Sequence, residues 1–303
     1  MLKRDHILSS FLCMVMCPTL YGVTEVYNLR VSTLTAERIN LDEKFSAKNM
    51  PGVFTSKLVT RIRQKNRGDK QLLVADVNTI IYSYKNFYAR ADFAFGYVRE
   101  KTAIATTKHT QTDDILLAVG YNHHIHPRLS LTYTVLGGIP THKDYGFEFF
   151  EFGTGHYAIA GQIAGIVKNE THSWISALRY IHFFNAKATV PLETTCMPVD
   201  FALGNVTDII IAFYKRIHKD HSLEIGYNPT FAINISTRPA LDPLLPSSGI
   251  RNGWYSTYRY AFEKGKHPMA IGLSASYSFD ITPKIDAAVK SNVSCWISYT
   301  IKF

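Results

Sequence analysis

Cysteine, charge and long apolar runs are all scarce in this chain of 303 residues, and each scarcity excludes a class of protein. Only 4 cysteines are present, which excludes a small domain cross-linked by several disulfides. Charged residues make up 19%, and the basic ones are scattered despite a net charge of +9, so a nucleic-acid-binding surface is not indicated. Beyond residue 22 no apolar run is long enough for a transmembrane helix.

The first 22 residues predict a secretory signal peptide. Lys3 and Arg4 precede a short apolar segment, 7–20, and Gly22 offers a small residue for cleavage. A lipoprotein anchored at Cys17 is the weaker alternative, because Met16 and its neighbours are not the small residues that lipidation requires.

Cleavage of this segment would leave Cys196 and Cys295 as the cysteines of the mature chain. The first falls in a predicted loop and the second in a predicted lipid-facing strand. We therefore expect no structural disulfide.

What the chain does have is alternation, and residues 293–303 show it best. The apolar positions are Val293, Cys295, Ile297, Tyr299, Ile301 and Phe303, and those between them are polar except for Trp296. A period of two predicts a β-strand with one apolar face. Its length suits a tilted strand that crosses a bilayer. The alternative for this segment alone is the edge strand of a soluble sandwich.

The same pattern recurs along the chain and predicts an all-β fold, a transmembrane antiparallel up-and-down β-barrel of about 12 strands, with 14 possible. The predicted strands are 53–63, 72–84, 87–97, 114–122, 129–135, 156–167, 173–184, 207–217, 223–236, 254–262, 269–279 and 293–303. Many exceed the roughly 5 to 6 residues usual in soluble sandwiches. The barrel would span 53–303, and 23–52 would form an N-terminal periplasmic segment or a plug.

One predicted strand fits poorly. Arg179 shares a face with four apolar residues that we expect to meet lipid, and a β-bulge would be needed to re-aim it. Those four residues are Ile175, Ala177, Ile181 and Phe183.

The predicted connections alternate in length. Long ones at 64–71, 99–113, 138–154, 185–205, 237–253 and 281–288 fall on one side, and short turns at 85–86, 123–128, 168–171, 219–221 and 263–267 fall on the other. Outer-membrane barrels have this asymmetry, with the short turns in the periplasm.

Two stretches resemble known families. The terminal strand with Ile297, Tyr299, Ile301 and Phe303 resembles the assembly signal of Gram-negative outer-membrane β-barrel proteins of the porin and transporter superfamily. Residues 137–156 resemble the outer-membrane transporters of the MetA-pathway phenol-degradation type, with His142 and Lys143 where that pattern prefers glycine. The resemblance implies an exported protein of the cell outer membrane, with lipid and the barrel-assembly machinery as partners.

The inward charges are the first candidate site. By alternation, the pore-lining candidates are Lys57, Arg61, Arg63, Asp76, Arg90, Asp92, Asp208, Arg216, Glu224, Arg259 and Glu263. These charges either pair and brace the lumen or form the field that a permeating solute meets. The surplus of arginine and lysine favours anions.

A second candidate site is the outer loop that contains His142, Lys143, Thr154 and His156, which forms either a simple turn or a constriction. His123, His124 and His126 fall in a predicted turn without a nearby cysteine or carboxylate, and His218 and His221 fall in another with Asp220 alone beside them, so we expect no metal and no cofactor.

We therefore expect an outer-membrane channel, and not an enzyme, for passive or selective passage of small solutes. Two alternatives stay open. One is an outer-membrane hydrolase with an outer-rim site drawn from Asp144, Glu148, Glu151 and His156. The other is a closed structural or adhesive barrel.

Overall fold

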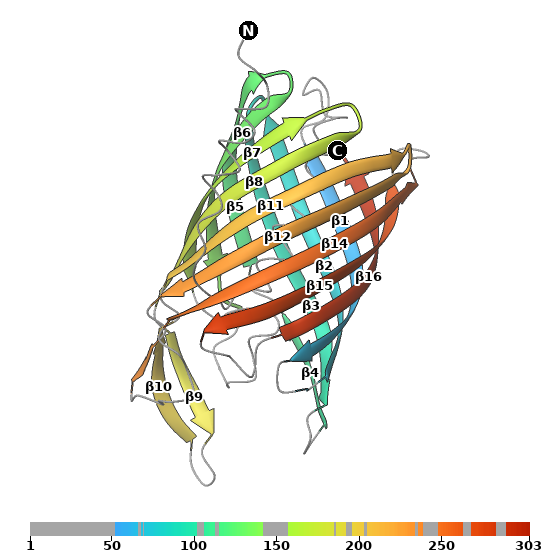
Figure 1. Ribbon diagram of the computed structural model, residues 1–303. Helices are drawn as coiled ribbons and strands as arrows, with labels where there is room; N and C mark the ends of the chain where they lie inside the picture. The colour runs from blue at the N-terminus through green and yellow to red at the C-terminus, as the bar shows by residue number, and fades with distance from the viewer. Residues whose placement is uncertain are drawn as a thin grey trace.

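The computed structural model shows one curved antiparallel sheet whose two edges meet, so that the strands form a closed barrel (Figure 1). The structure describes residues 52–65, 68, 70–101, 106–112, 115–141, 157–184, 186–191, 196–202, 205–233, 236–238, 248–262, 268–282 and 289–303. Among these residues, no helix is long and apolar enough to cross a membrane.

Most strands of the barrel wall are long, as the alternation predicts. In chain order the strands are β1 Gly52–Lys65, β2 Lys70–Tyr84, β3 Phe87–Lys101, β4 Thr106–Thr112, β5 Ile115–His126, β6 Leu129–Ile139, β7 Ala158–Lys168, β8 His172–Phe183, β9 Ala186–Pro191, β10 Cys196–Ala202, β11 Asn205–His218, β12 His221–Ile233, β13 Ser236–Arg238, β14 Ser248–Phe262, β15 Met269–Thr282 and β16 Val289–Lys302. Of these, β4, β9, β10 and β13 are short.

The barrel wall has 12 strand positions, which confirms the predicted all-β barrel and its strand count. The main sheet contains 13 strands, but β4 and β5 share one position because both pair with the same edge of β3. The wall closes where β1 pairs with β16 and β2 pairs with β3.

Successive side chains along each strand alternate between the outside and the inside of the barrel. On β1, Leu58 and Ile62 are at least half exposed on the outside, whereas Lys57, Val59 and Arg61 are buried on the inside. This alternation follows from the pleat of the strand. It produces an apolar outer surface and an inner surface of mixed character.

The structure corrects the prediction for β8. Arg179 and its apolar companions, Ile175, Ala177, Ile181 and Phe183, all face inward and are buried. Trp174, Leu178 and Tyr180 form the outward face instead. The pairing of β8 with β7 and β11 runs without a register shift, so no bulge is needed. The prediction was wrong because both faces of this strand carry apolar residues, and the period of two does not say which face turns outward.

Three expected connections contain strands that the sequence did not predict. β4 lies within the expected loop 99–113 and extends the position of β5 along β3. β9 and β10, from the expected loop 185–205, pair with each other and with β13 in a small separate sheet at one end of the barrel (Figure 1). His123 to His126 lie in β5 and not in a turn, because the β5–β6 hairpin is longer than expected.

Chain ends and glycines shape the closure of the wall. Gly52 and Phe303 exchange two backbone hydrogen bonds of 3.0 Å, and the Phe303 ring occupies the space that a Cβ at Gly52 would fill. Tyr88 covers Gly120 in the same way, and Trp296 covers Gly272. Glycine lets an aromatic ring lie flat on the neighbouring strand at these close approaches.

Candidate functional site

The inward face of the barrel carries a basic wall that centres on β1. Lys57, Arg61 and Arg63 share the inward face of this strand, with Val59 between the first two, and all are buried. Lys57 places its ammonium 4.2 Å from the centre of the Trp296 ring, a cation–π contact. Arg259 joins this wall from β14, because the register places it opposite Gly272, which in turn pairs with Trp296.

Two of the inward carboxylates are bound by arginine. Arg90 Nε donates to Asp92 Oδ2 at 2.7 Å, and Thr79 Oγ1 donates to Asp92 Oδ1 at 2.6 Å. Arg179 Nε donates to Asp208 Oδ2 at 2.9 Å, and the Arg179 Nη2 atom also contacts this oxygen. The Arg179–Asp208 pair joins the neighbouring strands β8 and β11, whereas the Arg90–Asp92 pair lies within β3, and both pairs neutralise their own charge.

Glu224 is the third inward carboxylate of the described part of the chain, and it has a neutral donor. The Tyr255 hydroxyl donates to Glu224 Oε1 at 2.8 Å, while the Tyr255 ring covers Gly226. The inward cations beyond the two arginine pairs include Lys57, Arg61, Arg63, Arg216 and Arg259, so the described inward face carries a positive surplus.

The opposite inner wall, from β5 to β11, carries two apolar clusters beside buried hydroxyls such as those of Ser130 and Thr132. Near the long loops, Leu116, Leu136, Ile181, Phe183 and Val206 pack in one cluster with three alanines. Near the short turns, Ile166 and Ile175 pack with Ala212 and Tyr214. The inward face is therefore divided into a basic side and an apolar side.

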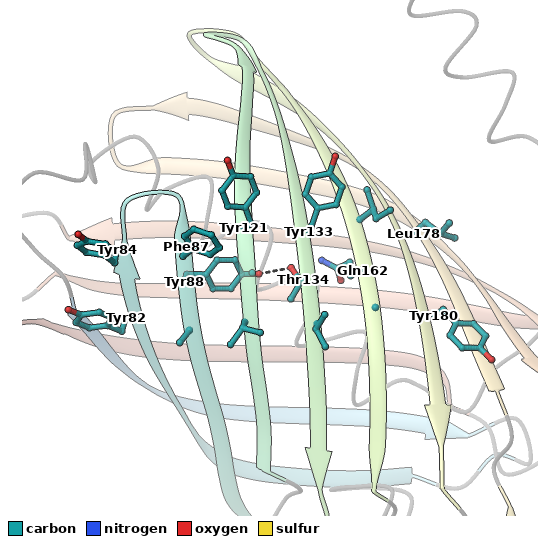
Figure 2. A pocket seen from close by; sticks show the side chains of 16 residues that line it. Tyr82, Tyr84, Phe87, Tyr88, Tyr121, Tyr133, Thr134, Gln162, Leu178 and Tyr180 are labelled. Carbon is teal, nitrogen blue, oxygen red and sulfur yellow. Dashed lines mark hydrogen bonds between the residues drawn. The ribbon is translucent and has the colours of Figure 1, made fainter.

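A polar belt crosses the apolar wall between these two clusters. The register aligns Tyr88, Thr134, Gln162, Arg179 and Asp208 in one row across five strands, with Gly120 between the first two. The hydroxyls of Tyr88 and Thr134 are hydrogen-bonded at 2.6 Å, as Figure 2 shows. Gln162 Oε1 is buried and has no hydrogen-bond partner among the described residues.

Asp76 does not line the lumen, and the prediction for this residue was wrong. It pairs with Leu58 of β1 and Phe95 of β3, both of which are at least half exposed on the outside. Its carboxylate accepts hydrogen bonds from Ser56 Oγ at 2.9 Å and Asn78 Nδ2 at 3.1 Å. Alternation failed here because β2 is apolar on both faces.

The other pore-lining candidates in the described chain lie on the inward face, where their role in conduction stays a prediction. Glu263 and the loop candidates His142, Lys143, Thr154 and His156 lie outside the described residues, as do Asp144, Glu148 and Glu151. The histidines His218 and His221 have ring centres 5.9 Å apart, and His221 Nδ1 is hydrogen-bonded to the Tyr258 hydroxyl at 2.5 Å.

Sequence reasoning missed the polar belt and the role of Trp296. A charged residue in an apolar strand was the available signal for the belt, since Arg179 indicates the inward face of its strand if lipid exposure is costly. The partner Asp208 was recognised as inward, but only the register shows that it lies beside Arg179. No sequence signal links Trp296 to Lys57.

No family model matches the sequence, and no curated protein matches it either. Solved structures do resemble the barrel. The COG4313 outer-membrane channel from Pseudomonas putida F1 superposes with a TM-score of 0.63 at 13% identity, over 85% of this chain and 97% of that chain.

Two further structures are similar to this chain. The β domain of the Bordetella autotransporter BrkA has a TM-score of 0.50 at 10% identity and covers 84% of this chain and 100% of its own. The NanC porin has a TM-score of 0.49 at 9% identity, over 80% of this chain and 98% of that chain. The expected resemblance to outer-membrane β-barrels is confirmed for the fold. The identities are too low to carry a function across.

Proposed function

We propose that this chain is an outer-membrane channel for small solutes that favours anions with an apolar part. The surplus of inward cations in a closed 12-position barrel is the observation that carries the proposal. Fixed charges that line a narrow pore select by sign and size. The apolar wall from β5 to β11 lies opposite the basic wall, so an organic anion finds a matching surface on each side.

The outer surface supports the membrane location. Large apolar side chains such as Leu58, Leu117, Ile163 and Leu273 are exposed on the strands, which is stable in lipid and not in water. Aromatic residues gather near the strand ends, as in the girdles of outer-membrane barrels. The cell outer membrane, after export by the signal peptide, is the location that this surface fits.

The length of the connections sets the orientation in this proposal. Turns at 85–86, 127–128, 169–171 and 219–220 form a short-turn rim, which would face the periplasm. Phe303 lies at this rim. At the periplasmic side, the barrel-assembly machinery would recognise the terminal residues Ile297, Tyr299, Ile301 and Phe303.

The proposal is tested by the ion selectivity of the purified full chain in planar bilayers. A salt gradient should give a reversal potential that indicates preference for anions. Replacing Arg63 and Arg259 together by Gln should lower that preference. Replacing Lys215 by Gln is the control, because Lys215 is exposed on the outer side of β11, and it should leave the preference unchanged. Arg90 is a poor choice for this test because it is bound to Asp92. Unchanged selectivity in a well-folded double variant would contradict the proposal.

One observation favours a closed structural barrel as the second candidate. Several inward side chains, among them Arg63, Ile181 and Val206, are almost fully shielded from solvent. A channel needs a passage that water and ions can enter. Absence of conductance from correctly folded protein would therefore favour the closed barrel. Neither candidate assigns a catalytic residue or a cofactor.

A further inference from the structure

A groove of about 800 Å³ lies on the outer face of the wall, across the strands from β2 to β8 (Figure 2). Tyr82 stands at one end and Tyr180 at the other, with Tyr121 and Tyr133 along the upper edge of the view. The groove opens on the outside of the barrel, and its lining includes four residues from the row of the polar belt, Tyr88, Gly120, Thr134 and Gln162.

Small side chains create the hollow. The register aligns Ala89, Val119, Val135 and Gly161 in one row between Tyr82 and Tyr180. A Cβ added at Gly161 would meet no atom within 4 Å. The row is thus a floor of short side chains between two large rings, and it opens toward the surrounding medium.

The next row toward the short-turn rim is aromatic. Phe87 and Tyr121 pair across β3 and β5 with ring centres 4.9 Å apart, and Tyr133 follows on β6. Tyrosine rings favour the boundary between hydrocarbon and lipid headgroups, because the ring is apolar and the hydroxyl is polar. The floor therefore lies in the hydrocarbon region if the aromatic row lies at its boundary.

Positive charge stands beyond the aromatic row. Lys85, in the β2–β3 turn, holds its ammonium 5.3 Å from the centre of the Tyr84 ring, and Tyr84 lines the groove. His123 lies next to Tyr121, with ring centres 6.4 Å apart, and is exposed. An apolar groove thus leads through aromatic rings to a cation.

We propose that this groove binds a phospholipid with an anionic headgroup from the periplasmic leaflet, and the proposal rests on the membrane location proposed above. One acyl chain lies on the floor row, and the headgroup phosphate contacts Lys85. Since the surrounding lipid tails are as apolar as the floor, the selectivity comes from packing in the hollow and from charge at the rim.

Native mass spectrometry of the full chain in detergent tests the site, with phosphatidylglycerol and phosphatidylethanolamine of identical acyl chains as probes. The wild-type chain should retain phosphatidylglycerol in preference. Ala89→Phe fills the floor and should abolish retention. Ala275→Phe is the matched control, because Ala275 is an exposed outward alanine on β15, outside the groove.

The charge is tested separately by Lys85→Asn. Lys85 has a φ of +52°, in the left-handed region that asparagine tolerates, so the turn should survive the change. The preference for the anionic lipid should fall about fivefold, which corresponds to about 1 kcal/mol. Lys215→Asn is the control on the outer side of β11 and should leave the preference unchanged.

Equal lipid retention by Ala89→Phe and Ala275→Phe would overturn the site. An unchanged preference for phosphatidylglycerol in the Lys85→Asn variant would also overturn it. The wild-type chain could instead form dimers that retain no lipid. If Ala89→Phe abolished those dimers, the groove would be assigned to a second copy of the chain. Conductance in planar bilayers is measured on the same samples, so a failed channel and a failed lipid site are distinguished.

Discussion

Asp76 and Asp92 show that the face of the wall on which a carboxylate lies determines which side chains bind it. Asp92 faces inward and is held by Arg90 and Thr79, whereas Asp76 faces outward and accepts hydrogen bonds from the neutral donors of Ser56 and Asn78. Asp92 pairs with Thr79, which lies three positions from Asp76 along β2. Because successive side chains of a strand point to opposite faces, the two carboxylates lie on opposite sides of the wall. Asp76 thus places a carboxylate on the outward face near the middle of β2.

Replacing each aspartate by asparagine should therefore have opposite effects on stability. Asp76→Asn removes a lipid-facing charge and should raise the free energy of unfolding by about 1 kcal/mol, below the cost of lipid-facing arginine or lysine. Asp92→Asn removes the anion that pairs with Arg90 on the inward face and should lower the free energy of unfolding by about 3 kcal/mol. Urea unfolding in liposomes, followed by tryptophan fluorescence, measures both. Destabilisation by Asp76→Asn as large as that by Asp92→Asn would contradict the outward assignment.

Strand β16 is the element whose register can be tested most directly. Cys295 lies on the outward face between Val293 and Ile297, which are both exposed there. In intact membranes Cys295 should resist a water-soluble maleimide, because lipid covers it. Lys219→Cys, in a short turn, is the reactive control. Fast labelling of Cys295 would mean a register shift of one residue, since such a shift exchanges the two faces.

The seam between β1 and β16 depends on glycine at one position. Gly52→Val would place a side chain where the Phe303 ring lies, and overpacking of this kind costs about 1 to 3 kcal/mol. We expect slower assembly, visible as a loss of heat-modifiable migration in gels, and the same defect after Phe303→Asp. Gly137→Val is the control, because nothing lies within 4 Å of a Cβ there. Normal migration of Gly52→Val would show that the ring can move aside.

For the whole molecule, the orientation in the membrane follows from the two rims. A peptide tag inserted after Gly68, an exposed residue in the connection between β1 and β2, should bind antibody on intact cells. The same tag after Lys219, at the short-turn rim, should bind only after the outer membrane is permeabilised. Both insertions fall outside the strands, so neither should prevent closure of the wall. Reversed accessibility would invert the proposed orientation.

The sequence by itself determined the barrel, the number of wall positions and the outward place of Cys295, because a period of two over long segments is a local property. It also identified Lys57, Arg61 and Arg63 as inward, since β1 places apolar and basic residues on opposite faces. Alternation says which residues share a face.

Only the tertiary structure decided what alternation leaves open. Where both faces are apolar, as in β8 and β2, closure of the wall selects the inward one, which is why Arg179 and Asp76 were misplaced. The ion pair of Arg179 with Asp208 and the row of small residues under the outer groove depend on the register between strands far apart in sequence. That register is fixed by pairing along the whole wall, so no local pattern could reveal it.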